Sequence, residues 1–399
     1  MIKNGKNKKV LKSKIFIIIV CLIVILSLVF GFTIKISNLI EKENICNAGL
    51  SIAGVESNSA PKNIVLMIGD GMGKNHIETA KKYYELDSLY MENLAKYEGT
   101  ISTFSRDNWT TDSAAAATAY STGIKVNNES VARYNGENIQ NMCEYAIGEN
   151  KKTGIITTTT IYDATPACFS GHADNRYDIE DILNSQLNNN INLFISGQKD
   201  NDIVTQEKIE KAKYKYADTY TELLEYSSSI ESNIFADFQS ISWDEKNAND
   251  KTPTLSSVSE TALSYLNEIS EDDGFFLMIE GADIDTYSHL NNFHSMVQEL
   301  YGFDQAVKTV VQWAEDRGDT MVIVTADHET GDLRYDDLET VSLNDNLFHS
   351  ENHTSQDVRV FFYGVVPYSV EHWNRLGQHL DNTQLSRVIR ENIYNYKYR

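Results

Sequence analysis

The sequence predicts an α/β fold built around a largely parallel β-sheet. Short apolar runs recur along the chain, and stretches with helical character lie between them. This alternation is typical of a parallel sheet covered by helices. Most of the runs also end directly at an acidic residue, a histidine or a glycine.

The first predicted strand is Asn63–Gly69, a continuous apolar run of the kind found in buried strands. Further strands are predicted at Thr153–Thr160, Asn192–Ser196, Gly274–Ile279, Thr320–Thr325 and Val358–Tyr363. Helices are predicted at Glu137–Glu149, Ser257–Ile269, Ser295–Asp316 and Thr383–Tyr394. The segment Thr205–Lys251 mixes helical pieces with Asn- and Asp-rich turns, and we interpret it as a peripheral excursion of the same domain.

The first 60 residues predict a membrane-associated leader ahead of a folded domain at residues 61–399. Residues 1–14 carry six lysines and no acid, and Ile15–Ile34 then runs for 20 residues without a charge. That length spans a bilayer as a helix, with the lysine-rich side in the cytoplasm. No clear cleavage site follows, which favours a transmembrane anchor over a signal peptide. The domain would then lie outside the cell membrane on a polar stalk, residues 35–60, or be secreted if the leader is cleaved.

The charge of the chain argues against nucleic acid as a partner. Residues 1–40 carry +7, so the remaining residues carry −29 of a chain whose net charge is −22. Such a surface repels polyanions. It would also repel a small anionic substrate unless bound metal ions supply local positive charge.

The alanine-rich run Ser113–Ala119 places a serine at the start of a predicted helix. Backbone N–H groups are unpaired at a helix N-terminus, and they favour an anion there. Ser113 is therefore a candidate nucleophile. Taken alone, however, the pattern is more commonly that of a helix cap at Asp112 or Ser113.

Acidic residues follow four of the predicted strands, and the last of these acids is followed directly by a histidine. Asp70, Asp163, Glu280 and the pair Asp327-His328 all come at or after strand ends. In open α/β sheets, sites are built at that edge. One acid in a loop indicates little, whereas four strands that end in metal-type ligands indicate a metal site.

Asp285 and His289 are four residues apart and would lie on one face of a helical turn. A carboxylate and an imidazole placed in this way can bind one zinc ion. A surface Asp–His pair without a metal is the alternative. His353, just before the last predicted strand, is a further histidine at the end of an element.

In these segments the chain resembles the alkaline phosphatase family, from Asn63 to the last helix. Each motif alone is weak or moderate, but six in the same order make a chance match very improbable. The motifs are Ile68–Gly73, Thr111–Ala119 with Ser121-Thr122-Gly123, Asp163–Ala167, Glu280–His289, Thr325–His328 and His353-Thr354. The resemblance implies a three-layer α/β fold, with helices on both sides of a largely parallel central sheet.

The resemblance also implies hydrolysis of phosphate monoesters through a phosphoserine, at two zinc ions and one magnesium ion. Ser113 would be the nucleophile, and Arg176 would bind the phosphate. The first zinc ion would be held by Asp285, His289 and His353, and the second by Asp70, Asp327 and His328. The magnesium ion would be held by Asp70, Thr165 and Glu280, with Asp163 acting through water.

Other functions of the same fold stay open at this point. Phosphodiesterases, sulfatases and other phosphoryl-transfer enzymes share it, and an inactive metal-binding surface protein is a further alternative. The presence of Asp163, Thr165 and Glu280 favours the monoesterase, since diesterase relatives lack the magnesium site. Thr286 stands where relatives often have Lys or His, which leaves the affinity of the third metal site open. A homodimer is also left open, because the chain lacks much of the sequence that forms dimer contacts in larger relatives.

Overall fold

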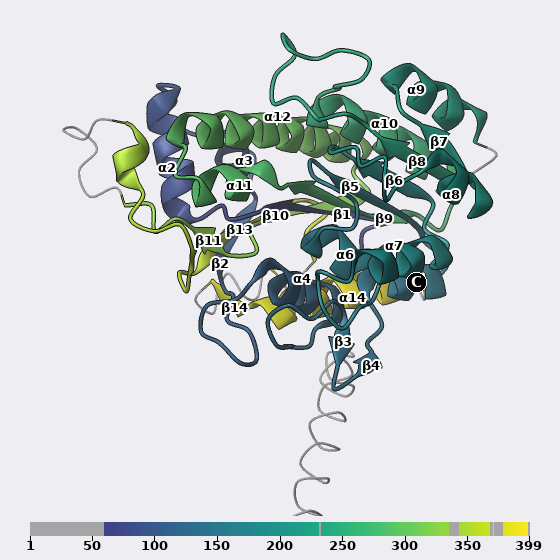
Figure 1. The fold of residues 1–399 in the computed structure, drawn as a ribbon, viewed down its shortest axis with the longest axis horizontal. Helices are drawn as coiled ribbons and strands as arrows, with labels where there is room; N and C mark the ends of the chain where they lie inside the picture. The colour runs from purple at the N-terminus through teal and green to yellow at the C-terminus, as the bar shows by residue number, and fades with distance from the viewer. Residues whose placement is uncertain (1–59, 231–232, 335–342, 368–369, 371–377, 398–399) are drawn as a thin grey trace, which may run out of the picture. The chain divides into compact units, whose positions relative to one another are not determined.

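A ten-stranded β-sheet runs through the folded part of the protein (Figure 1). The computed structural model describes residues 60–230, 233–334, 343–367, 370 and 378–397. Across the sheet the order is β14 (His379–Asp381), β2 (Tyr97–Ser102), β13 (Val358–Gly364), β10 (Thr320–Thr325), β1 (Asn63–Gly69), β9 (Phe275–Gly281), β5 (Lys152–Thr157), β6 (Leu193–Ser196), β8 (Asn233–Asp237) and β7 (Tyr214–Ala217).

Strand β1 lies among the central strands and has the bounds that the sequence predicts. All seven of its residues are buried. It pairs in parallel with both β10 and β9, so Ile68 lies opposite Thr325 on one side and Glu280 on the other. Among the described strands of this sheet, only β13 runs in the opposite direction. The largely parallel sheet is therefore confirmed, and the C-terminal ends of its central strands meet at one edge.

Helices cover both faces of the sheet, which confirms the layered α/β architecture (Figure 1). One face carries α2 (Lys74–Tyr83), α10 (Leu255–Ser270), α11 (Asp283–His289) and α12 (Phe293–Arg317). The other carries α4 (Ser113–Thr122), α6 (Ala164–Ser170), α7 (Ile179–Asn188) and α14 (Asn382–Lys397). Helix α5 (Met142–Gly148) packs against α6 and α14. The remaining described elements are α3 (Tyr90–Asn93), α8 (Gln206–Lys211), α9 (Tyr220–Ser229), η1 (Asp345–Leu347) and the two-stranded pairs β3 (Arg133–Tyr134) with β4 (Glu137–Asn138) and β11 (Glu329–Thr330) with β12 (His353–Thr354).

Helix α4 begins at Ser113, as the sequence predicts, and every residue in it is buried. The small alanine side chains let the helix pack closely against α6 and α14. Asp112 caps it, because its carboxylate accepts a hydrogen bond of 2.9 Å from the backbone N–H of Ala115. The helix ends at Gly123, whose φ of +77° is a conformation that glycine adopts without strain.

Two predictions about the elements need correction. Thr205–Lys251 lies at the periphery, as predicted, but it is more than an excursion, because it supplies β8 and the edge strand β7 to the main sheet. These strands have only four and five residues, too few to stand out among the polar residues around them. Glu137–Glu149 is not one helix: its first residues form β4, and α5 starts at Met142 because Asn141 caps it through the N–H of Glu144, at 2.9 Å.

The predicted basic segment, the transmembrane anchor or signal sequence at 15–34, and nearly all of the stalk lie outside the described residues. Within the described ranges, no helix is both long enough and apolar enough to cross a bilayer.

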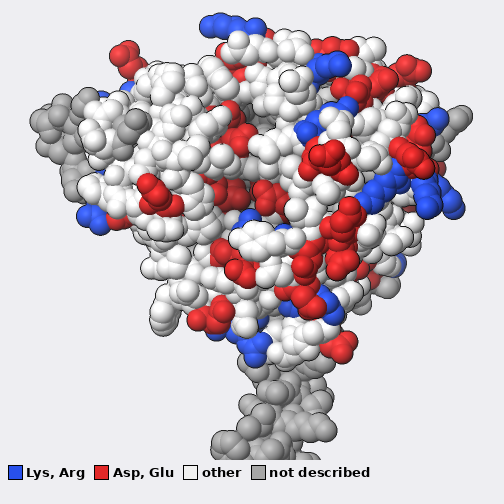
Figure 2. Space-filling model, in the orientation of Figure 1, with Lys and Arg blue, Asp and Glu red and all other residues white. Residues whose placement is uncertain are grey.

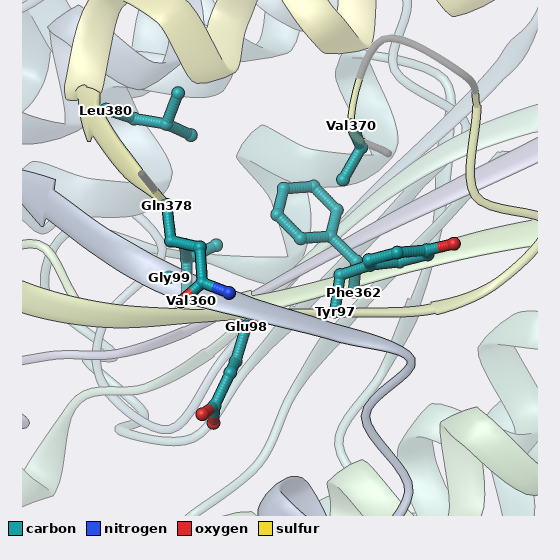
Figure 3. A pocket seen from close by; sticks show the side chains of 8 residues that line it. All are labelled: Tyr97, Glu98, Gly99, Val360, Phe362, Val370, Gln378 and Leu380. Atoms are coloured by element: carbon teal, nitrogen blue, oxygen red, sulfur yellow. The ribbon is translucent and has the colours of Figure 1, made fainter. Parts of the chain in front are cut away.

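A small apolar pocket lies where β2, β13 and β14 meet (Figure 3). Phe362, Val370 and Leu380 lie on one side of these strands, and the carboxylate of Glu98 points to the other. None of the site residues predicted from the sequence lines it.

Candidate active site

The predicted site residues come together at the C-terminal edge of the sheet. Asp70 directly follows β1, Glu280 lies near the end of β9, and Asp327 follows β10. Since these three strands are parallel neighbours, their ends bring the carboxylates to one place. On the face shown in Figure 2, acidic side chains gather in a hollow near the middle of the molecule.

Ser113 opens α4 and lies against this cluster. Its hydroxyl is 3.2 Å from Nε2 of His328, and the residue is only 4% exposed. Its backbone lies at the positive end of a helix of ten residues. The arrangement shelters the hydroxyl and sets it beside groups that can bind a cation.

A first metal-type group consists of Asp285, His289 and His353, whose ligand atoms lie within 4.8 Å of one another. Helix α11 places Asp285 and His289 one turn apart, as the sequence predicts, with 3.2 Å between carboxylate and Nε2. Nε2 of His289 is 3.0 Å from Nε2 of His353. The Nδ1 atoms face the carbonyl oxygens of Glu351, at 2.5 Å, and Thr111, at 3.0 Å. Because a carbonyl only accepts, each Nδ1 carries a proton, so each neutral ring would offer the lone pair of Nε2 toward the same point, as in a metal site.

The charges in this first group depend on each other. The hydrogen bond with Asp285 raises the pKa of His289 to about 9, against the effect of burial. Burial, followed by the nearby His328, lowers the pKa of His353 to about 4. Burial alone would raise the pKa of Asp285, but the imidazoles of His289, His328 and His353 outweigh it and lower that pKa. Without a metal ion, a proton on His289 thus supplies positive charge between the rings of His289 and His353, where a bound cation would otherwise supply it.

A second group, Asp70, Asp285 and His328, also has ligand atoms within 4.8 Å of one another. Asp327 borders it, because its Oδ2 lies 3.0 Å from Nε2 of His328. Asp285 therefore lies between the two groups, whereas the resemblance assigns it to the first alone. Oδ1 of Asp327 accepts hydrogen bonds from the backbone N–H of Gly71, at 3.1 Å, and of His328, at 2.9 Å.

Two carboxylate oxygens of this second group are left without hydrogen bonds. Oδ1 of Asp70 and Oδ2 of Asp327 are buried and accept no well-oriented hydrogen bond among the described residues; both lie near Nε2 of His328, at 3.5 and 3.0 Å. Burial, together with the charges of Asp327 and Asp285, raises the pKa of Asp70 well above its usual range. Two buried carboxylates that share a single imidazole are costly unless a cation compensates them. The residues present therefore fit a metal ion in this place.

A third group offers oxygen ligands only. Burial, followed by the charge of Asp163, raises the pKa of Glu280 to about 8. The hydroxyls of Thr157 and Thr165 lie close enough to lower that pKa in part, and Thr157 donates a hydrogen bond of 2.5 Å. The hydroxyl oxygen of Thr165 is buried with no hydrogen-bond partner in the described part of the chain. Such a set of oxygens suits a hard cation such as magnesium.

Arg176 lies between Asp112, the residue before Ser113, and Asp163, which borders the third group. Its guanidinium donates to Asp112, at 3.3 Å, and to Asp163, at 3.2 Å. Its sequence neighbours Asp174 and Asp178 are not its partners, because Asp174 pairs with another arginine and Asp178 accepts from a backbone N–H. Burial would lower the pKa of Arg176, but Asp163 and Asp112 outweigh it and raise that pKa, so the side chain stays charged.

The sequence analysis did not predict the supporting roles of Thr157 and Thr330, nor the pairing of the cap residue Asp112 with Arg176. Thr157 orients Glu280, and the hydroxyl of Thr330 donates to Asp285 while lying 3.2 Å from Nδ1 of His328. Asp112 both caps α4 and pairs with Arg176. Thr330 comes two residues after His328, and this closeness was the only signal in the sequence that could have indicated it.

A mostly parallel sheet with histidines and carboxylates gathered at its C-terminal edge defines an α/β protein with a metal-type polar site. A buried serine at a helix N-terminus faces that site. The chain belongs to the alkaline phosphatase family, whose family model matches residues 61–200 and 190–337. The resemblance inferred from the six motifs is therefore confirmed.

Similar proteins agree with this assignment. Alkaline phosphatase 3 of Bacillus subtilis (strain 168) is 31% identical over 287 residues, which are 68% of this chain and 61% of that protein. This chain thus spans less than two thirds of that relative's length. The solved structure of alkaline phosphatase from the Antarctic bacterium TAB5 is 28% identical, with a TM-score of 0.71 over 84% of this chain and 98% of that one. A mutant of the TAB5 enzyme with magnesium bound in its M3 site is 28% identical, with a TM-score of 0.70 over 84% and 99% of the two chains.

Proposed function

We propose that the protein hydrolyses phosphate monoesters to an alcohol and inorganic phosphate through a phosphoserine at Ser113. The observation that carries the proposal is the position of the Ser113 hydroxyl, 3.2 Å from His328 and at the N-terminus of α4. Membership of the alkaline phosphatase family supports the same reaction.

We propose two zinc ions and one magnesium ion as cofactors. The imidazole and carboxylate ligands of the first two groups suit zinc. The oxygen ligands Glu280 and Thr165, with Asp70 and with Asp163 through water, suit magnesium. The magnesium-bound TAB5 mutant supports this last part. Asp285, His289 and His353 would hold one zinc ion; Asp70, Asp327 and His328 would hold the other.

In this mechanism Ser113 Oγ attacks phosphorus in line with the ester oxygen, the bond from phosphorus to that oxygen breaks, and the serine proton passes through water to the leaving oxygen. Bound divalent cations would lower the pKa of the hydroxyl and neutralise charge on the attacking and leaving oxygens. The alcohol then leaves, and water cleaves the phosphoserine to release phosphate. Arg176, held by Asp112 and Asp163, presents a planar pair of N–H groups to two phosphate oxygens. The N–H groups at the start of α4 favour the same anion.

Turnover of a monoester and of a diester with the same chromophore tests the proposal. We expect 4-nitrophenyl phosphate to be hydrolysed far faster than bis(4-nitrophenyl) phosphate. Preference for the diester would point to the phosphodiesterase alternative, and no turnover of either by metal-loaded protein would point to the inactive surface protein.

We also propose that the catalytic domain is held at the outer face of the cell membrane by Ile15–Ile34. The apolar run is long enough to span a bilayer, and six lysines precede it. The strongly negative remainder of the chain would be repelled by anionic lipid headgroups, so a polar spacer suits this arrangement.

A further inference from the structure

Two aromatic side chains stand exposed next to the residues proposed for chemistry. Trp109 is 79% exposed and lies four residues before Ser113. Tyr177 is 72% exposed and directly follows Arg176. They are the two most exposed of the large hydrophobic side chains in the described ranges.

The two loops that carry these rings are joined by one segment, Asn128-Glu129. The side chain of Asn128 donates to the carbonyl of Thr110, at 3.2 Å, and accepts from the N–H of Asp112, at 3.1 Å. These bonds fix the backbone on either side of Thr111 and anchor the loop that carries Trp109.

Glu129 holds the second loop in the same way. Its carbonyl accepts from the N–H of Arg176, at 2.8 Å, and its carboxylate accepts from the side chain of Asn175, at 2.7 Å. The N–H of Tyr177 in turn donates to the side chain of Asn175, at 3.0 Å. The loops that carry Trp109 and Tyr177 are therefore fastened, through Asn128-Glu129, to the segments that carry Ser113 and Arg176.

The indole of Trp109 is supported on one side. Its ring centre lies 5.8 Å from that of Phe104, at an interplanar angle of 50°. Phe104 is itself covered by the ammonium of Lys125, 3.7 Å from its ring centre. The indole thus packs against Phe104, and most of its surface stays exposed and available for stacking with a planar group.

We propose that Trp109 and Tyr177 form an aromatic rim that stacks against a planar ring in the leaving alcohol of the substrate. Stacking of a second ring on an exposed aromatic side chain is favourable and would stabilise the bound ester. With the phosphate held between Ser113 and Arg176, a ring in the alcohol part of the ester would extend toward the loops that carry Trp109 and Tyr177. The inference rests on the proposed function and narrows its substrate class to esters of ring-bearing alcohols, such as nucleoside monophosphates and aryl phosphates.

The test compares kcat/KM for adenosine 5′-monophosphate, 4-nitrophenyl phosphate and glycerol 1-phosphate in the metal-loaded protein. Trp109→Ala should lower kcat/KM for the adenosine ester about tenfold relative to glycerol phosphate, because the indole on which the base would stack is removed. Tyr177→Ala should act in the same direction, and Trp109→Phe should keep most of the preference. Leu224→Ala, an exposed apolar residue on α9, is the matched control and should change no ratio.

Each outcome decides the matter. A selective loss for the adenosine ester alone supports a rim that takes a nucleobase beyond the ribose, and a loss for both ring-bearing esters supports a rim for any aryl group. The rim proposal would be wrong if kcat/KM fell equally for all three esters, if it changed for none of them, or if only the oligomeric state changed. The proposed phosphatase activity would be unaffected by any of these results. Failure of the unaltered protein to hydrolyse any of the three would overturn both.

Discussion

The hydroxyl of Ser113 lies 3.2 Å from Nε2 of His328, although 215 residues separate them in the sequence. Helix α4 supplies the serine from one layer, and the loop after β10 supplies the histidine from the edge of the sheet. This contact joins the candidate nucleophile to the second metal-type group, and it is the relationship on which the proposed chemistry depends.

Replacing Ser113 by alanine should remove the covalent intermediate. We expect kcat to fall about a thousandfold or more, because the other groups cannot replace an attacking oxygen. Trapping with radiolabelled phosphate at acid pH, followed by peptide mapping, should label Ser113 in the unaltered protein and nothing in the variant. Ser229→Ala, on the exposed end of α9, serves as the control. Label on any other residue would contradict the assignment.

Removal of metal should abolish turnover, and zinc with magnesium should restore it. Elemental analysis of His353→Ala should show less bound zinc than in the unaltered protein, since one imidazole of the first group is lost. His379→Ala is a matched control, because that histidine is largely exposed on β14. Full activity in protein shown to be free of metal would refute this prediction.

Arg176→Ala should weaken inhibition by inorganic phosphate about 10- to 100-fold, because two charge-assisted hydrogen bonds are lost. Arg133→Ala removes a nearby arginine that pairs with Asp174, and it should leave phosphate inhibition unchanged. Inhibition constants measured for both variants decide between phosphate binding by Arg176 and a purely structural role for its ion pairs with Asp112 and Asp163.

The metal-free protein should lose stability as pH rises from about 4.5 to about 8. Over this range the unfolded chain ionises Glu280 near its ordinary pKa of 4.5, while the folded chain keeps the proton because its pKa is raised to about 8. Glu280→Gln should flatten this slope and raise the free energy of unfolding at pH 8 by up to about 5 kcal/mol. Urea unfolding of protein freed of metal by a chelator, at several pH values in this range, measures the free energy of unfolding. Glu260→Gln, at an exposed position, is the control. Identical slopes for Glu280→Gln and the unaltered protein would argue against it.

Cells that express the full chain should retain the activity in the membrane fraction. Removing residues 1–34 should move it to the soluble fraction, since the apolar run is then gone. Sequencing the N-terminus of the mature protein separates an anchor from a cleaved signal. Activity mainly in the medium, with a new N-terminus beyond residue 34, would exclude the anchor.

The central strands were predictable because they are continuous apolar runs, and β1 and β10 have the predicted bounds. Strand β2 was not, because it is largely half-exposed and includes Glu98 and Gly99. The short strands β7 and β8 were missed because their polar surroundings hid them. What decides these strands is pairing with a neighbour, and pairing leaves little trace in a short stretch of sequence.

Features that depend on near neighbours along the chain could be predicted from the amino-acid sequence. Ser113 begins a helix because alanines follow it, and Asp285 and His289 share a face because they are one turn apart. The tertiary structure alone decided which distant charges meet: Arg176 with Asp112 and Asp163, and Asp285 between two metal-type groups. Backbone propensity acts over a few residues, whereas these contacts arise when parallel strands pack and bring the ends of separate segments to one edge.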